Sequence, residues 1–134
     1  ATDHNGDGIQ DVVVGSLQGE IPDKPSNTGT LRIFLGVQND FLSATPFLEL
    51  AGENNGDRFG FAASHLGDIN QDGSPDYLSF AHLNDEIGYN QGRIYYLSTT
   101  EEPEYIPLEY PSQIAGQQFG RSTSFVSSPI AFDT

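Results

Sequence analysis

The sequence predicts an all-β fold built from β-propeller blades of four antiparallel strands, about two blades offset by one strand. Three observations predict it. Several features recur at a spacing of about 60 to 65 residues, glycine and proline separate short apolar runs, and no segment keeps a helical period. Four short antiparallel strands in each repeat are the make-up of a propeller blade.

The repeat consists of three features that each occur twice, in the same order. They are residues 3–11 (DHNGDGIQD) and 68–76 (DINQDGSPD), residues 29–34 (GTLRIF) and 92–97 (GRIYYL), and an Ala-Gly pair leading to Phe-Gly at 51–60 and 115–120. We name residues 3–11 the first acidic loop and residues 68–76 the second acidic loop. Agreement in order and spacing indicates one structural unit present twice.

Each copy is expected to supply short strands. Leu31 and Ile33 alternate with less apolar neighbours, as in a strand with two unlike faces, and the β-branched run 12–14 is typical of a buried strand. Pro107 restricts its own strand to a sheet edge. The expected strands lie at 11–16, 30–35, 46–50, 61–66, 77–82, 93–98, 105–109 and 119–126.

These strands form two blades in one domain, residues 1–134. Blade one takes the strands within 11–50, with 119–126 as a candidate addition, and blade two spans 59–110. Two blades cannot close a ring and would leave sheet edges uncovered. Three arrangements therefore stay open: a piece of a longer propeller, a protomer of a head-to-tail homo-oligomer, or a chain whose tail joins its own first blade.

Both acidic loops follow the pattern D-x-N-x-D-G-x-x-D, which predicts a metal site in each. Oxygen-bearing side chains occupy positions 1, 3, 5 and 9, the glycine at position 6 permits a sharp turn, and position 7 offers a backbone carbonyl. A hard, all-oxygen set favours Ca²⁺ over zinc, copper or magnesium. The predicted ligands of the two calcium sites are Asp3, Asn5, Asp7, Ile9 (carbonyl) and Asp11, and Asp68, Asn70, Asp72, Ser74 (carbonyl) and Asp76.

Two other interpretations fit the loops less well. An EF-hand begins similarly but needs a glutamate at position 12, where this chain has Val14 and Ser79. An Asx-rich turn without an ion explains one such loop, but it does not explain two with the same ligand positions.

Composition excludes several functional classes. Nineteen acidic against 5 basic residues give a formal charge of −14, which repels nucleic acid. The chain has no cysteine, so disulfides and thiol catalysis are excluded. No apolar run approaches the length of a membrane-spanning helix. Residues 1–4 do not resemble a signal peptide, so we expect a mature form or a piece of a longer protein.

Catalytic signatures are weak. His4, at position 2 of its loop, is expected to be solvated, and no G-x-S-x-G motif occurs. Five tyrosines suit either a sugar-binding face or, as we favour, packing between blades: Tyr89, Tyr95, Tyr96, Tyr105 and Tyr110. Loops 18–28 and 83–91 should lie at the end away from the acidic loops, and they are the first place to look for a partner.

A family resemblance rests on these residues. Phe59-Gly60 followed by 67–76 resembles the FG-GAP repeat of integrin α-subunit β-propellers and related bacterial proteins, and 3–11 followed by 12–16 (VVVGS) is similar. The resemblance implies that each metal loop joins the inner two strands of a blade and binds calcium through the ligands named above. Phe80 departs from the glycine of the motif. Ser128 stands where a third loop would begin, so no third site is expected.

The resemblance also implies a function. The implied function is that of a calcium-binding, integrin-like β-propeller segment, which has an extracellular adhesion or ligand-binding role and no enzymatic activity. Its location would be extracellular, cell-surface or periplasmic, and its partner a protein or glycan. The alternatives are a non-catalytic or substrate-positioning propeller part of a secreted polysaccharide-active enzyme, and a lectin-like glycan binder.

Overall fold

The computed structural model describes residues 2–86, 89–99 and 104–108, and these residues form strands and turns but no helix. The strands are Val12–Ser16 (β1), Thr30–Phe34 (β2), Leu48–Ala51 (β3), Ala63–Gly67 (β4), Asp76–Ala81 (β5), Arg93–Ser98 (β6) and Glu104–Leu108 (β7). The all-β prediction and the first seven expected strands are confirmed. The eighth, 119–126, lies outside the described residues. A helix with the length and apolarity needed to cross a bilayer is not found in the described part of the chain.

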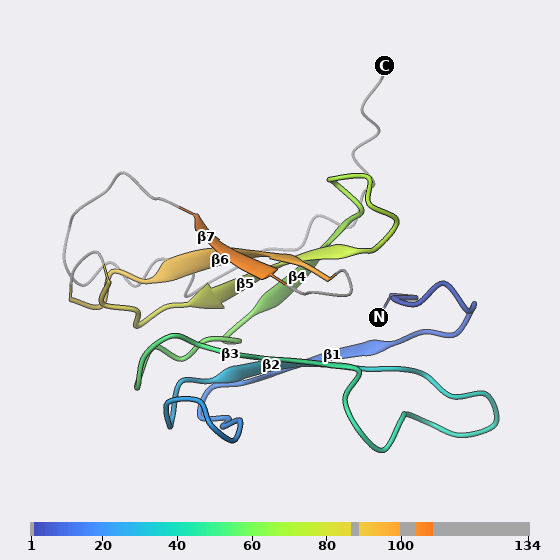
Figure 1. Cartoon of the computed structure of the whole chain (residues 1–134), viewed down its shortest axis with the longest axis horizontal. Helices are drawn as coiled ribbons and strands as arrows, with labels where there is room; N and C mark the ends of the chain where they lie inside the picture. The colour runs from blue at the N-terminus through green and yellow to red at the C-terminus, as the bar shows by residue number, and fades with distance from the viewer. Residues whose placement is uncertain (1, 87–88, 100–103, 109–134) are drawn as a thin grey trace.

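The strands form two antiparallel sheets, in the orders β1-β2-β3 and β4-β5-β6-β7 (Figure 1). Within each sheet, strands that follow one another in sequence pair with each other, as in a blade. The pairing of β1 with β2 runs from Val12 opposite Phe34 to Ser16 opposite Thr30, and β5 pairs with β6 in the same sense. In the described residues the first sheet has three strands and the second has four, and the segment 119–126, on which the expected one-strand offset depends, lies outside them.

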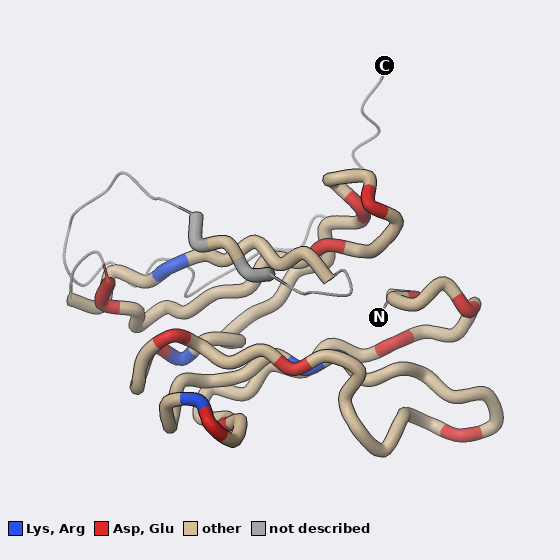
Figure 2. The backbone as a smooth tube through the Cα atoms, in the orientation of Figure 1, with Lys and Arg blue, Asp and Glu red and all other residues tan. Residues whose placement is uncertain are grey.

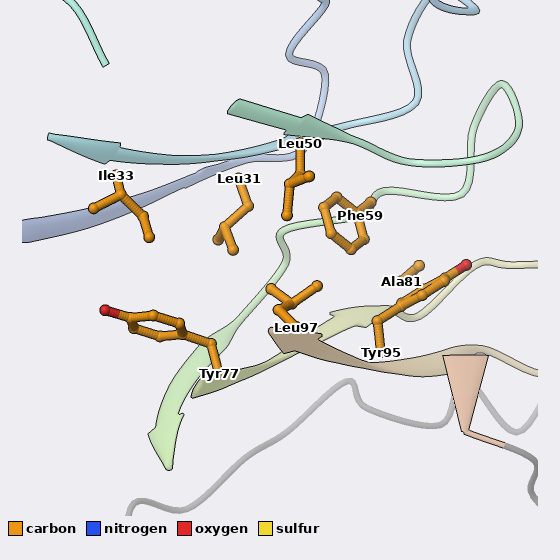
Figure 3. Close-up of a cluster of buried hydrophobic side chains, with 8 residues drawn as sticks. All are labelled: Leu31, Ile33, Leu50, Phe59, Tyr77, Ala81, Tyr95 and Leu97. Atoms are coloured by element: carbon orange, nitrogen blue, oxygen red, sulfur yellow. The ribbon is translucent and has the colours of Figure 1, made fainter. Parts of the chain in front are cut away.

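The core lies between the two sheets (Figure 3). The first sheet contributes Leu31 and Ile33 from β2 and Leu50 from β3. The second contributes Tyr77 and Ala81 from β5 and Tyr95 and Leu97 from β6, and Phe59 enters from the link between the sheets. All of these side chains are buried. The two sheets are therefore packed face to face across shared apolar side chains, as neighbouring blades are.

Two sequence expectations about burial have different outcomes. Tyr95 is fully buried between the sheets, which confirms the packing interpretation for this residue. Tyr89 is 72% exposed, and the side chains of Tyr105 and Tyr110 lie outside the described part of the structure.

The expectation that the whole run 12–14 is buried is wrong, because Val14 is 42% exposed. It lies opposite Arg32 on the face of the first sheet that points away from the core.

The Phe59-Gly60 pair fixes the link between the sheets. Phe59 packs edge-on against Tyr95, with ring centroids 5.2 Å apart, and its N–H donates to the carbonyl of Thr28 at 2.9 Å. Gly60 has a φ of +77°, and a Cβ built on it would lie 2.2 Å from the carbonyl oxygen of Thr30. Only glycine lets the link backbone lie this close to β2.

A buried polar network joins the blades at the end away from the acidic loops. Asn84 Nδ2 donates to Asp57 at 2.6 Å and lies 3.3 Å from Tyr95 Oη. The Tyr95 hydroxyl donates to Glu53 Oε2 at 2.9 Å, which also accepts from Arg93 at 3.0 Å. Burial raises the pKa of Asp57 above its ordinary value of 3.8, although hydrogen bonds from Asn84 and then Asn54 oppose this.

The raised pKa of Asp57 predicts a pH dependence of stability. Because the folded state holds this proton more tightly than the unfolded state, the contribution is complete below pH 3.8 and is lost as the pH rises through the folded pKa. We expect Asp57→Asn to gain stability relative to wild type across that rise. Urea unfolding in chelator-containing buffers from about pH 3.5 to 7 measures it. Asp40→Asn, at an exposed site, is the control, and a constant difference between Asp57→Asn and wild type would contradict the prediction.

Candidate metal centres

The two acidic loops lie at the same end of the two sheets. The first runs directly into β1, and the second joins β4 to β5. Figure 2 shows the acidic residues of both loops gathered at this end. Loop 18–28, between β1 and β2, and the described part of loop 83–91, between β5 and β6, lie at the opposite end of the sheets, which confirms their predicted placement.

The aspartate at position 1 organises each loop in the same way. In the first loop, Asp3 accepts the N–H of Asp7 at 3.0 Å and that of Gly8 at 2.8 Å. In the second loop, Asp68 accepts from the equivalent N–H groups at 3.0 and 2.9 Å. The backbone of both loops is therefore curled around this carboxylate.

The side chains at positions 3 and 5 make the same hydrogen bonds in both loops. Asn5 Nδ2 donates to Asp7 at 2.8 Å, and Asn70 Nδ2 donates to Asp72 at 2.6 Å. The other oxygen of the position 5 aspartate accepts the N–H of position 7 at 2.8 Å in both loops. In the second loop, the N–H of Ser74 and then the amide of Asn70 hold the pKa of Asp72 below its usual value. Three of the predicted ligand side chains are thus brought together in each loop.

Position 9 differs between the loops. Asp11 Oδ2 accepts the N–H of His4 at 2.6 Å, and its Oδ1 accepts that of Gly36 at 2.8 Å. Asp76 Oδ2 accepts the N–H of Ile69 at 2.9 Å, and the Tyr96 hydroxyl lies within hydrogen-bond reach of the same carboxylate. Both carboxylates are fully buried at the start of their strands.

Residues at the end of β6 and just after it, which were not among the predicted ligands, surround the second loop. The Ser98 hydroxyl donates to Asp72 at 3.2 Å, and the Thr99 hydroxyl donates to the carbonyl of Pro75 at 2.5 Å. The buried Tyr96 hydroxyl lies beside the Asp76 carboxylate, within hydrogen-bond reach of it. Its pKa is raised to about 12 by burial and by the Asp76 carboxylate. In the sequence, the signal that could have identified these residues was the end of segment 92–97 and its comparison with the other copy of this repeat, 29–34.

His4 is buried, so the expectation of a solvated histidine is wrong. Its side chain is only 7% exposed, its Nδ1 lies 3.2 Å from Tyr77 Oη, and it packs edge-on against Phe47 at 5.2 Å. Burial lowers the pKa of His4. The reason is tertiary: the first acidic loop lies against the second sheet, where His65 Nε2 is also 3.2 Å from Thr2 Oγ1.

A cavity of about 590 Å³ separates the two acidic loops. Its lining combines both loops with their neighbours: Thr2, Asp3, His4, Asn5, Gly6, Phe47, His65, Gly67, Asp68, Gly73, Ser74, Pro75 and Thr99. The loops are therefore open to solvent on the sides that face each other.

The donor chemistry fits a hard cation. Among the described residues, no three His, Cys, Asp or Glu side chains form a cluster arranged for a metal. The carboxylates instead accept N–H groups of their own loops, and the carboxylate at position 9 is turned to backbone donors. Each loop nevertheless offers only oxygen ligands, with three carboxylates among its nine residues. A divalent cation of the calcium type suits such a set, because it balances the repulsion between the carboxylates.

Comparisons with known proteins give the chain's relationships. Residues 3–79 match the family model described as FG-GAP-like repeat. Integrin alpha-5 of Xenopus laevis is 30% identical over 125 residues, which are 91% of this chain and 11% of that protein. Integrin alpha-8 of Gallus gallus is 38% identical over 78 residues, 56% of this chain and 7% of that protein. Integrin alpha-IIb of Mus musculus is 34% identical over 97 residues, 70% and 9% respectively. The chain thus spans 7 to 11% of the length of these relatives.

Proposed function

The chain belongs to the FG-GAP-like repeat family, and from this membership we propose that it is a calcium-binding, integrin-like β-propeller segment with an extracellular ligand-binding role. Two antiparallel blades, packed face to face, support the propeller architecture. Similarity to integrin α chains over most of the residues supports the adhesive, non-enzymatic role and the location outside the cytosol.

One observation carries the calcium proposal: the same inward arrangement of positions 1, 3 and 5 occurs in both acidic loops. Three carboxylates within nine residues repel one another unless a cation balances them. Calcium takes six to eight oxygen ligands in flexible geometry. The side-chain oxygens at positions 1, 3, 5 and 9 and the carbonyls of Ile9 and Ser74 would hold it. When bound, the ion supplies a cross-link between the loop and the strand that follows it.

The partner surfaces follow from the same architecture. Loops 18–28 and 83–91, at the end away from the acidic loops, are the proposed contact surface for a protein or glycan ligand. Val14 on the first sheet and Ile106 on the second are 42% and 48% exposed, as expected where further blades would pack. We propose such blades, in a longer propeller or in a head-to-tail homo-oligomer. A stable 14.5 kDa monomer in sedimentation would exclude the homo-oligomer.

Calcium titration tests the proposed function. Calorimetry on the chelator-treated chain is expected to show saturable binding at two sites, with dissociation constants near 10⁻⁴ to 10⁻³ M, the range of extracellular modules. At ten times the dissociation constant, each site adds about 1.4 kcal/mol to the free energy of unfolding, so the melting temperature rises. Magnesium at the same concentration is the control for ionic strength. The absence of saturable heat, together with an unchanged melting temperature, would contradict the proposal.

A further inference from the structure

The first acidic loop contains an Asn-Gly pair, Asn5-Gly6, at its third and fourth positions. We propose that this pair is a site of spontaneous deamidation, a covalent modification that converts Asn5 into aspartate or isoaspartate. The inference goes beyond the proposed calcium binding, because the reaction needs only the residues of the loop and water. It also gives two loops of the same sequence pattern different chemical stabilities.

The reaction begins with attack by a backbone nitrogen on the side chain that precedes it. The nitrogen of Gly6 forms a bond to Cγ of Asn5, the bond between Cγ and Nδ2 breaks, and ammonia leaves with the proton given up by the nitrogen. Water then opens the resulting succinimide ring. Opening at Cγ yields aspartate, whereas opening at the main-chain carbonyl yields isoaspartate, whose backbone is one methylene longer. Water is the only co-reactant.

Hydrogen bonds hold the Asn5 amide beside the peptide that attacks it. Its Oδ1 accepts the N–H of Asp7 at 3.2 Å, which closes a tight turn that contains both Cγ of Asn5 and the nitrogen of Gly6. The same N–H stabilises the negative charge that develops on Oδ1 during the attack. Nδ2, the leaving group, donates to the Asp7 carboxylate at 2.8 Å. The attacked carbon is thus fixed near the attacking nitrogen.

A carboxylate is placed to take the proton that Gly6 loses. The N–H of Gly6 donates to Asp3 Oδ1 at 2.8 Å, so a general base already touches the nucleophile. A Cβ built on Gly6 would meet nothing within 4 Å, so no packed neighbour restricts the closing ring. Asn5 and Gly6 are both exposed, and water therefore reaches the succinimide.

The second acidic loop has the same hydrogen bonds without the reactive pair. Asn70 Oδ1 accepts the N–H of Asp72 at 3.0 Å, and its Nδ2 donates to that residue at 2.6 Å. The residue after Asn70 is Gln71 instead of glycine. A side chain on the attacking residue crowds the ring closure, whereas glycine has no Cβ. We therefore expect Asn70 to stay intact where Asn5 reacts.

The chain's other Asn-Gly pair, Asn55-Gly56, is an internal control. Asn55 is also exposed, but its Nδ2 donates to the carbonyl of Ser26 at 3.0 Å. The N–H of Gly56 donates to the carbonyl of Asn27 at 2.9 Å. A peptide carbonyl is a far weaker base than a carboxylate, so we expect Asn55 to react more slowly than Asn5 in the folded chain.

Peptide mass mapping of the full chain tests the proposal. The chain is incubated in chelator at neutral pH, either folded or unfolded in urea, and replacement of the amide by a hydroxyl raises the mass of the peptide concerned. In the folded chain, Asn5 is expected to react at least about tenfold faster than Asn55, about 1.4 kcal/mol in the activation free energy. In urea the two rates should be similar. Equal rates in the folded chain, or a faster reaction at Asn55, would overturn the proposal.

Two variants separate the effect of the glycine from that of the base. Gln71 has a φ of +62°, which glycine adopts readily, so Gln71→Gly should fold and make Asn70 reactive. Asp3→Asn keeps an oxygen for the N–H of Gly6 but cannot take its proton, and it should slow the reaction at Asn5 at least about tenfold. An unchanged rate at Asn5 in Asp3→Asn, or an Asn70 that stays intact in Gln71→Gly, would contradict the assignment.

The modification falls on a predicted calcium ligand, and this consequence rests on the proposed function. Isoaspartate lengthens the backbone inside the loop, so the isoaspartate form, separated by chromatography, is expected to lose one of two sites in calcium calorimetry. Retention of both sites would overturn this consequence. Fresh chain that binds no calcium would contradict the proposed function, whereas the deamidation rates are read by mass in chelator, so the two failures are distinguishable.

Discussion

Replacing Phe59 with alanine is expected to lower the free energy of unfolding by about 3 to 5 kcal/mol. The side chain is fully buried between the sheets and packs edge-on against Tyr95. Its removal leaves a cavity bordered by residues of both blades, and neither sheet can close that cavity without moving relative to the other. The effect therefore falls on the contact between blades as well as on local packing.

Urea unfolding followed by far-ultraviolet circular dichroism, at fixed calcium concentration, measures this loss. Phe41→Ala, at a site that is 82% exposed, is the control and should change stability by less than about 0.5 kcal/mol. Phe59→Leu keeps most of the apolar volume and provides a smaller, measurable loss if the alanine variant does not fold. Equal losses at positions 59 and 41 would show that Phe59 does not join the blades.

The sequence predicted the strands well because its signals are local. Gly and Pro bounded the short apolar runs, and the repeat identified β1 and β2 as the counterparts of β5 and β6. It could not predict which face of a strand is buried. Leu31 and Ile33 face the core in β2, yet their repeat counterparts in β6, Ile94 and Tyr96, lie on the opposite face from the core residue Tyr95. Each blade covers its neighbour on one side, so equivalent residues meet different surroundings.

The same reasoning applies to the acidic loops. The spacing of D-x-N-x-D-G predicted the curl and the residues that meet at positions 1, 3 and 5. It could not predict the burial of His4 or the bond from Gly36 to Asp11, because these contacts join segments distant in sequence. The ligand assignments themselves stay predictions until calcium binding is measured.

Gly60→Ala is expected to lower the free energy of unfolding by about 2 to 5 kcal/mol, from two separate causes. The left-handed backbone, with a φ of +77°, disfavours any residue with a Cβ by about 1 to 2 kcal/mol. The added Cβ would also lie 2.2 Å from the carbonyl oxygen of Thr30, and overpacking of this kind costs typically 1 to 3 kcal/mol. The contact is with backbone, so no side-chain rotation can relieve it.

Gly56→Ala separates the two causes. Gly56 has a φ of +87°, but a Cβ built on it meets nothing within 4 Å. Its alanine variant should therefore show the backbone effect alone, and the difference between the two variants measures the contact between the link and β2. If Gly56→Ala and Gly60→Ala lose the same stability under identical urea unfolding, the close approach contributes nothing. The glycine would then serve only the turn between the blades, and the Phe-Gly pair would join them through its phenylalanine alone.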